Sequence, residues 1–177
     1  MIGRNGSGKT VLFKCICGFL RVDDGAVFVD GKQIGKEIEA PESIGAIIET
    51  PGFLPGYSAR QNLQFLAGIR RKIGKRRSMR PSEKSDWIRK RKRHVGKYSL
   101  GMRQRLGIAQ AIMEEPSLLI LDEPMNGLDN QGVQEMRQLF LKLKDEGKTI
   151  LLASHNREDI AALCDTTVEI DRGKIVG

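Results

Sequence analysis

Short apolar runs alternate along this chain with longer segments of helical character, and turn residues or charged residues separate them. The runs that predict strands lie at residues 26–29, 44–48, 118–121, 149–153 and 166–170. The segments that predict helices begin at Lys9 and otherwise cover residues 58–69, 101–114, 132–146 and 157–164. Strands that alternate with helices are typical of α/β proteins with a parallel sheet, so we expect that fold class.

A glycine-rich segment leads into the first predicted helix. It consists of Gly3, Arg4, Asn5, Gly6, Ser7, Gly8, Lys9 and Thr10, and it fits the phosphate-loop pattern G-x-x-x-x-G-K-[ST]. In such a loop the backbone N–H groups converge on the β-phosphate, the lysine reaches the β- and γ-phosphate oxygens, and the threonine hydroxyl ligates Mg²⁺. The segment therefore predicts a nucleoside triphosphate site, with an ordinary glycine-rich turn as the alternative.

The apolar run at residues 118–121 ends in two adjacent carboxylates, Asp122 and Glu123. Mg²⁺ on a phosphate chain needs a carboxylate opposite the loop, and the end of a buried strand holds one rigidly. We therefore predict Asp122 as a metal ligand. Glu123 points to the other side of the chain, where it could polarise an attacking water or accept its proton. The alternative is that both are ordinary polar residues at a strand end.

Residues 98–105 open the predicted helix that precedes this strand, and they resemble the signature motif of ATP-binding cassette (ABC) ATPases, L-S-G-G-Q-x-x-R. Ser99, Gly101 and Arg105 match that pattern, whereas the motif's first, third and fifth positions differ. In that family the signature of one subunit closes over the γ-phosphate held by the other. The resemblance therefore implies that Ser99 and Gly101 bind nucleotide, and that the fold is a P-loop NTPase.

Two further segments follow the order of that family. Residues 126–129 resemble the loop that crosses the dimer interface, which implies that Asp129 lies near nucleotide. His155, after the predicted strand at 149–153, resembles the switch histidine that contacts the γ-phosphate. A plain polar residue at a strand end is the alternative for His155.

Glu49 stands where most ABC ATPases carry glutamine. This replacement, together with Tyr-Ser-Leu-Gly-Met in the signature, is similar to the bacitracin-export and lantibiotic-immunity branch of bacterial ABC exporters. A carboxylate is a hard oxygen donor, so we predict Glu49 as a further ligand of Mg²⁺ or of its waters. A solvated loop acid is the alternative.

The resemblance covers nearly the whole chain, whose 177 residues suit one domain. It implies a nucleotide-binding core at residues 1–53 and 114–177 and a helical lobe at residues 54–113. A phosphate loop normally follows a buried strand, yet only Met1 and Ile2 precede Gly3. We therefore expect an N-terminally truncated domain whose sheet lacks its first strand.

The net charge of +8 comes from one segment. Residues 70–97 contain 14 Lys and Arg and two acidic residues, whereas the remainder has 16 basic and 20 acidic residues. Within it, residues 75–93 show no helical apolar period and include Pro81, where an amphipathic helix would be expected. A solvated insert is one explanation; a local frameshift in the coding sequence is our sharper hypothesis.

Together with the resemblance, these observations predict an ATP- and Mg²⁺-dependent ATPase subunit of an ABC transporter that exports a peptide antibiotic or similar substrate. Glu123 is the expected general base, and His155 is expected at the γ-phosphate. No apolar run approaches the roughly 18 residues that span a bilayer, and no secretory leader is evident. The three cysteines lack metal-site spacing and suit a reducing cytosol. We expect a homodimer on the cytoplasmic face of the membrane, joined to a transmembrane permease and without nucleic acid. The alternatives are a damaged remnant with little activity and a soluble ABC ATPase that acts on nucleic acid.

Overall fold

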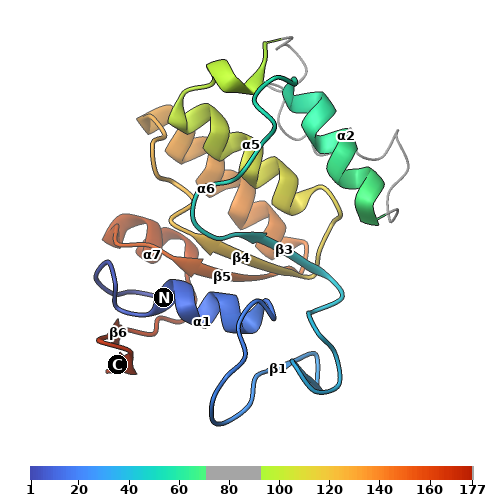
Figure 1. The fold of residues 1–177 in the computed structure, drawn as a ribbon. Coiled ribbons are helices and arrows are strands. Elements are labelled where there is room, and N and C mark those ends of the chain that lie inside the picture. The colour runs from blue at the N-terminus through green and yellow to red at the C-terminus, as the bar shows by residue number, and fades with distance from the viewer. Residues whose placement is uncertain (71–92, 177) are drawn as a thin grey trace.

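The computed structural model describes residues 1–70 and 93–176, which fold around a three-stranded parallel sheet (Figure 1). Its strands are β3 (Ile44–Ile47), β4 (Leu118–Asp122) and β5 (Thr149–Ala153), hydrogen-bonded in that order. Ile44 pairs with Leu118, and Leu118 pairs with Thr149. Most of the basic segment at 75–93, and with it the frameshift hypothesis, lies outside the described residues.

The remaining elements connect and cover these strands. Among the described residues, the helices are α1 (Lys9–Ile16), α2 (Ala59–Arg70), the short 3₁₀ helix η2 (Val95–Lys97), α5 (Leu100–Ile112), α6 (Asn130–Asp145) and α7 (Arg157–Leu163). The same part of the chain contains two small antiparallel pairs: β1 (Phe28–Val29) with β2 (Lys32–Gln33), and β6 (Ile170–Asp171) with β7 (Lys174–Ile175). The alternation of parallel strands and helices confirms the predicted α/β class.

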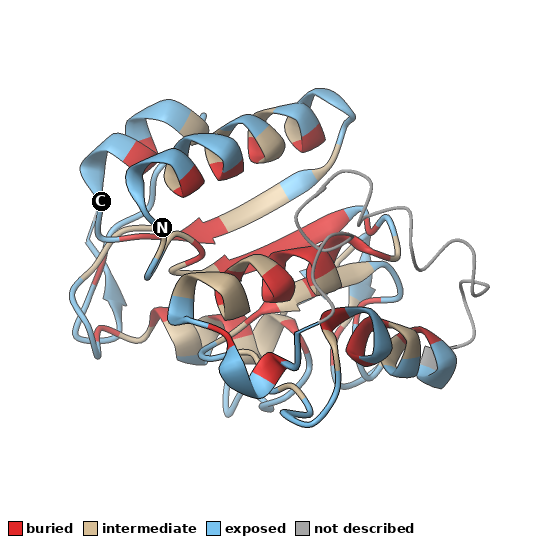
Figure 2. Cartoon of the chain, turned by 90° about the horizontal axis from the view of Figure 1, so that it is seen from above, coloured by how far each residue is buried: buried red, intermediate tan, exposed pale blue. Residues whose placement is uncertain are grey.

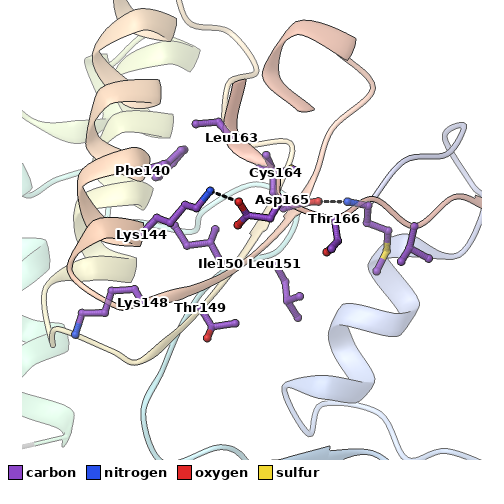
Figure 3. Close-up of a pocket in the computed structure, with 13 residues that line it drawn as sticks. Phe140, Lys144, Lys148, Thr149, Ile150, Leu151, Leu163, Cys164, Asp165 and Thr166 are labelled. Atoms are coloured by element: carbon purple, nitrogen blue, oxygen red, sulfur yellow. Dashed lines mark hydrogen bonds and ion pairs between the residues drawn. The ribbon is translucent and has the colours of Figure 1, made fainter. Parts of the chain in front are cut away.

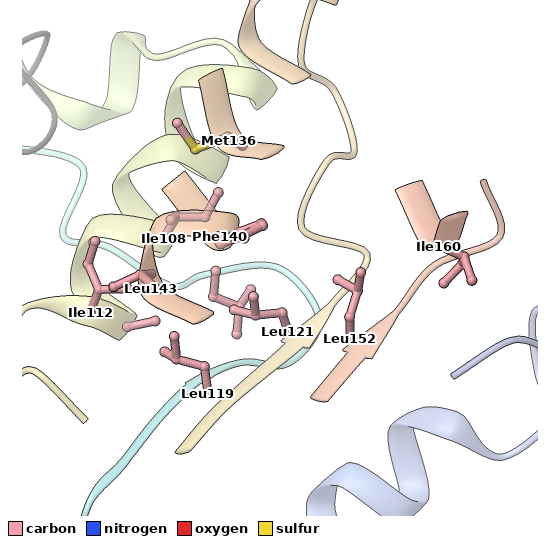
Figure 4. Packing of buried hydrophobic residues seen from close by; sticks show 11 residues of the cluster. Ile108, Ile112, Leu119, Leu121, Met136, Phe140, Leu143, Leu152 and Ile160 are labelled. Atoms are coloured by element: carbon pink, nitrogen blue, oxygen red, sulfur yellow. The ribbon is translucent and has the colours of Figure 1, made fainter. Parts of the chain in front are cut away.

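β4 is the central strand, and helices cover both of its faces. Leu119 and Leu121 point to one face, where α5 and α6 contribute Ile108, Phe140 and other residues to a buried cluster (Figure 4). Leu118 and Ile120 point to the opposite face, where Phe13 of α1 packs on them. A strand that is buried on both faces reads as a continuous apolar run, which is why the segment was recognisable in the sequence. Figure 2 shows this burial at the middle of the sheet and the exposed outer sides of the helices.

A third apolar cluster lies apart from the sheet, between α2, η2 and α5. Its buried members are Ala59, Leu63, Val95, Tyr98, Leu106, Ala109 and Met113. The cluster falls within residues 54–113, for which we predicted a helical lobe. The division into a core and a lobe remains a prediction.

The predicted strand at 166–170 is wrong for most of its length, because only Ile170 belongs to a strand. The segment does meet Met1 and Ile2: the Ile2 N–H donates to the Val168 carbonyl and the Ile170 N–H to the Ile2 carbonyl, each at 2.8 Å. These contacts form a single parallel bridge between Ile2 and Glu169, and Ile170 pairs with Ile175 of β7.

Beside this bridge, a cavity of about 380 Å³ separates β5 from residues 163–168. Figure 3 shows Ile150, Leu151, Leu163 and Cys164 around it, with the Lys144 ammonium and the Asp165 carboxylate paired at 2.5 Å. Burial raises the pKa of the Cys164 thiol, because the thiolate would lose hydration there. The sheet edge at β5 is thus lined by apolar side chains and closed on one side by an ion pair. Within the described ranges, no helix combines the length and the apolar character needed to span a bilayer.

Candidate functional site

The phosphate loop winds around the ammonium group of Lys9. This side chain is buried, and its Nζ donates to the carbonyl oxygens of Gly3 at 2.6 Å and Arg4 at 3.0 Å. Gly8, directly before α1, has φ 109°, a conformation that side chains disfavour and glycine accepts. This turn joins the loop to the first residue of α1.

Thr10 and Asp122 meet although they are far apart in the sequence. The Thr10 hydroxyl donates to Asp122 Oδ2 at 2.6 Å, which places the first turn of α1 against the carboxyl end of β4. Glu49 follows β3 on the same side, with φ 61°, and its Oε1 accepts from Lys14 Nζ at 2.6 Å. Its side chain is 63% exposed and the ion pair engages only Oε1, so the second carboxylate oxygen can accept another partner.

Glu123 and His155 come from the ends of neighbouring strands and form a hydrogen bond. His155 Nδ1 lies 2.9 Å from Glu123 Oε2. The Glu123 backbone has φ 48°, an uncommon value for a residue with a side chain. Its N–H donates to the Ala153 carbonyl at 2.9 Å, and this contact to β5 turns the carboxylate toward His155.

One cavity of about 540 Å³ gathers most of the predicted phosphate and metal residues. It is lined by Asn5, Gly6, Ser7, Gly8, Lys9, Thr10, Val11, Glu49, Thr50, Leu100, Gln104, Asp122, Glu123 and Asn126. The cavity residues that our sequence analysis missed are Val11, Thr50, Leu100, Gln104 and Asn126. Leu100 and Gln104 are four residues apart on α5 and therefore share a helix face, which is the one signal the sequence offered.

Ser99, Gly101 and Asp129 line a second cavity, of about 430 Å³, and not the first. Ser99 caps α5 by accepting from the Met102 N–H at 3.3 Å. Asp129 caps α6 by accepting from the Gly132 N–H at 2.8 Å, and its Oδ1 lies 3.8 Å from Arg105 Nη2. Within one chain, the predicted signature residues and the phosphate loop thus belong to separate hollows.

The residues of the first cavity fit a nucleotide with Mg²⁺. Among the described residues, the buried Oγ of Ser7 and Oε1 of Glu123 lack a hydrogen-bond partner, which a phosphate oxygen or a water could supply. The Thr10 hydroxyl and the Asp122 carboxylate are the hard oxygen donors that Mg²⁺ prefers. The described part of the chain gathers no group of three or more His, Cys, Asp and Glu side chains that could hold a metal.

Comparison with known proteins agrees with this geometry. The family model described as "ABC transporter" matches residues 1–126. The chain is 39% identical over 175 residues to the uncharacterized ABC transporter ATP-binding protein YybJ of Bacillus subtilis, covering 99% of this chain and 80% of that relative. It is 40% identical over 178 residues to the bacitracin transport ATP-binding protein BcrA of Enterococcus faecalis, covering 99% of this chain and 58% of BcrA.

The fold is also found among solved structures. A dimeric ATP-binding cassette in a post-hydrolysis state, bound to ADP and Pi, superposes with a TM-score of 0.85 at 18% sequence identity. The match covers 99% of this chain and 82% of that one. At this level of identity the likeness concerns the fold, and it includes the sheet and the helices on which the two cavities are built.

Proposed function

Because this chain belongs to the family of ABC transporter ATPases, we propose that its first cavity binds ATP with Mg²⁺ and that Glu123 and His155 support hydrolysis of the γ-phosphate. The observation that carries this proposal is the convergence of the phosphate loop, Asp122 and Glu123 on one cavity. The proposal also includes a bacitracin-like export role, since BcrA is named for bacitracin transport. The chain spans little more than half of BcrA, so substrate and direction belong to the proposal.

Each residue has a role that follows from its position. Lys9 is held at the loop and binds the β- and γ-phosphate oxygens. Thr10, Asp122 and Glu49 hold Mg²⁺ directly or through water, and the ion, when bound, neutralises charge that develops on the phosphates. Glu49 would take part through Oε2, because Lys14 engages Oε1.

Glu123 is the proposed general base. It accepts a proton from the attacking water, and its unpaired Oε1 is the free atom for that water, since Oε2 bonds to His155. His155 orients this carboxylate and presents its other ring nitrogen to the γ-phosphate. A proton on the imidazole would add charge stabilisation as the phosphate leaves.

The second cavity supports a proposed homodimer. Ser99 and Gly101 lie at the N-terminus of α5, where backbone N–H groups and the helix dipole favour an anion. Since they do not line their own chain's nucleotide cavity, a second copy that faces them would place its γ-phosphate there. We further propose a transmembrane permease as partner, the cytoplasmic membrane face as location, and no nucleic-acid contact.

Paired variants test binding and chemistry separately. Glu123→Gln should keep ATP affinity within about twofold but lower turnover by about 10²- to 10⁴-fold, because the base contributes only to the chemical step. It should also accumulate as an ATP-bound dimer. Lys9→Ala should lose ATP binding as well as turnover. Fluorescent-nucleotide titration, phosphate release and size-exclusion chromatography measure the three quantities.

Two outcomes would contradict the proposal. If the chain does not bind ATP, the first cavity is not a nucleotide site. If Glu123→Gln keeps its turnover, the base lies elsewhere, with His155 the next candidate. Lys32→Ala serves as the control, because Lys32 forms an exposed ion pair with Glu42 and lines neither cavity.

A further inference from the structure

The first turns of α5 form the wall between the two cavities. Leu100 and Gln104 face the nucleotide cavity, whereas Ser99, Gly101 and Arg105 face the second one. The loop after β4 is divided in the same way: Asn126 lines the first cavity, and residues 127–129 line the second. An occupant of either cavity would therefore contact the same two segments, the start of α5 and the 126–129 loop.

This wall is closely packed. A Cβ atom at Gly101 would lie 2.4 Å from the Gly127 carbonyl oxygen, and one at Gly127 would lie 2.6 Å from Leu100 Cγ. Neither glycine tolerates a side chain without movement of its neighbour. On the far side, Arg105 is paired with Glu135 of α6 and lies near Asp129. The start of α5 and the 126–129 loop are thus packed together, with little space between them.

Gln104 connects this wall to the proposed base. Its side chain is only 6% exposed, and Nε2 donates to the main-chain carbonyl of Glu123 at 3.3 Å. The same carbonyl accepts from the Asn126 N–H at 3.2 Å. Two donors from the wall therefore converge on one carbonyl, that of a residue with φ 48°.

The backbone conformation of Glu123 requires contacts such as these two hydrogen bonds to hold it. A left-handed φ at a residue with a side chain persists only where surrounding contacts hold it. The orientation of the carboxylate follows from that φ, because rotation of the backbone would carry the side chain away from His155. The hydrogen bond from Gln104 reaches the main chain and not the carboxylate, so it fixes direction without neutralising the base.

We propose that Gln104 is a positioning residue for Glu123, which keeps the base carboxylate aligned with the helix start that carries Ser99 and Gly101. A second copy that docks on Ser99 and Gly101 would thereby influence the alignment of the Glu123 carboxylate in this chain's own site. The inference rests on the proposed role of Glu123 as general base. It assigns Gln104 no contact with the reacting atoms.

Gln104→Met tests the donation, because methionine is similar in size and cannot donate a hydrogen bond. We expect kcat for ATP to fall about 2- to 10-fold, the range expected for loss of one neutral hydrogen bond. KM and nucleotide affinity should stay within about twofold, since the phosphate loop is unchanged. Gln110→Met is the matched control: it makes the same change on α5 at a half-buried residue that lines neither cavity.

Gln104→Glu gives a second readout, which packing alone would not move. A glutamate carboxylate cannot donate to the Glu123 carbonyl, but its protonated form can. Burial favours the protonated form, so kcat relative to wild type should recover as the pH is lowered from 8 to 6. The same ratio for Gln104→Met should remain flat. If Gln104→Met does not fold, this pH dependence still decides the question.

Hydrogen exchange separates this inference from the proposed function. The Asn126 amide, which bonds to the Glu123 carbonyl, should exchange faster in Gln104→Met and be unchanged in Gln110→Met, whether or not the chain hydrolyses ATP. If wild type hydrolyses ATP and Gln104→Met matches it in kcat and exchange, the inference is wrong. If KM rises while kcat is constant, Gln104 serves binding, and the inference is equally wrong. Faster exchange in a chain that lacks turnover would support the contact and refute the proposed hydrolysis instead.

Discussion

A buried ion pair between Arg137 of α6 and Asp159 of α7 should be the most sensitive electrostatic contact in the described structure. Arg137 Nε and Nη2 donate to Asp159 Oδ1 at 2.8 and 2.6 Å. The Asp159 side chain is 2% exposed and that of Arg137 13%. This hydrogen bonding to Asp159 also raises the pKa of Arg137. The pair holds α7, which begins two residues after His155.

The loss of stability in each single variant depends on which charge remains buried without its partner. Removing one member of a buried pair costs about 3–5 kcal/mol, because the other remains desolvated without a partner. The cost of Asp159→Ala should lie near the lower end of this range, because Glu158 is 3.4 Å from Arg137 Nη2 and remains as a partner. That exposed pair offsets at most about 1 kcal/mol. Arg137→Met should lie near the upper end, because the Asp159 carboxylate is almost fully buried.

The double variant Arg137→Met/Asp159→Leu separates pairing from desolvation. Replacing both charges by apolar groups should cost no more than about 2 kcal/mol, well below the sum of the single changes. With a urea m-value of about 2 kcal/mol/M, the single variants should shift the unfolding midpoint by about 1.5 to 2.5 M. Lys32→Ala, which breaks the exposed pair with Glu42, is the control and should shift it by at most about 0.5 M. If the single changes were as mild as the control, or if their effects simply added, the argument from burial would be refuted.

Two further predictions concern His155 and Cys17. His155→Ala should lower kcat about 10²-fold with ATP binding retained, because Glu123 loses its orienting partner and the γ-phosphate loses a donor; a parallel loss of affinity in the titration would contradict a role in chemistry. Burial raises the pKa of Cys17 from 9.0 to about 11, so the folded state disfavours the thiolate that the unfolded chain forms. Stability should therefore be unaffected below pH 9 and fall as the pH rises from 9 toward 11, and urea unfolding of Cys17→Ala should lack this component of the slope.

Much of the fold and of the first cavity could be predicted from the sequence because the relevant signals are local. The apolar run before Asp122 marks a strand buried on both faces, and the glycine spacing before Lys9 marks a turn into a helix. The contacts that the sequence did not reveal cross between elements. Gln104 reaches a main-chain carbonyl, Lys14 pairs with Glu49, and Arg137 pairs with Asp159; neither composition nor periodicity encodes such meetings.

The predicted strand at 166–170 is a case in which the sequence predicted a strand that mostly does not form, because strand formation also depends on contacts between elements. Its alternation of apolar and polar residues suits a strand, but a strand exists only with a partner. Ile2 provides one bridge, Ile170 pairs with Ile175 of β7, and Thr166 and Val168 line the cavity beside β5. Sequence describes what a segment can form, whereas pairing decides what it does form.

The hydrogen bonds of Lys9 and Thr10 have a consequence for selectivity. The Lys9 ammonium bonds to the carbonyls of Gly3 and Arg4, and the Thr10 hydroxyl bonds to Asp122. A ligand therefore exchanges these bonds for its own and does not simply add to them, so each new contact yields only the difference between two bonds. Free phosphate, which replaces few of them, should gain little from entering. The proposed ligand, a metal-bound triphosphate, would engage lysine, hydroxyl and carboxylate together, and this simultaneous exchange should favour it over smaller anions that are abundant in a cell.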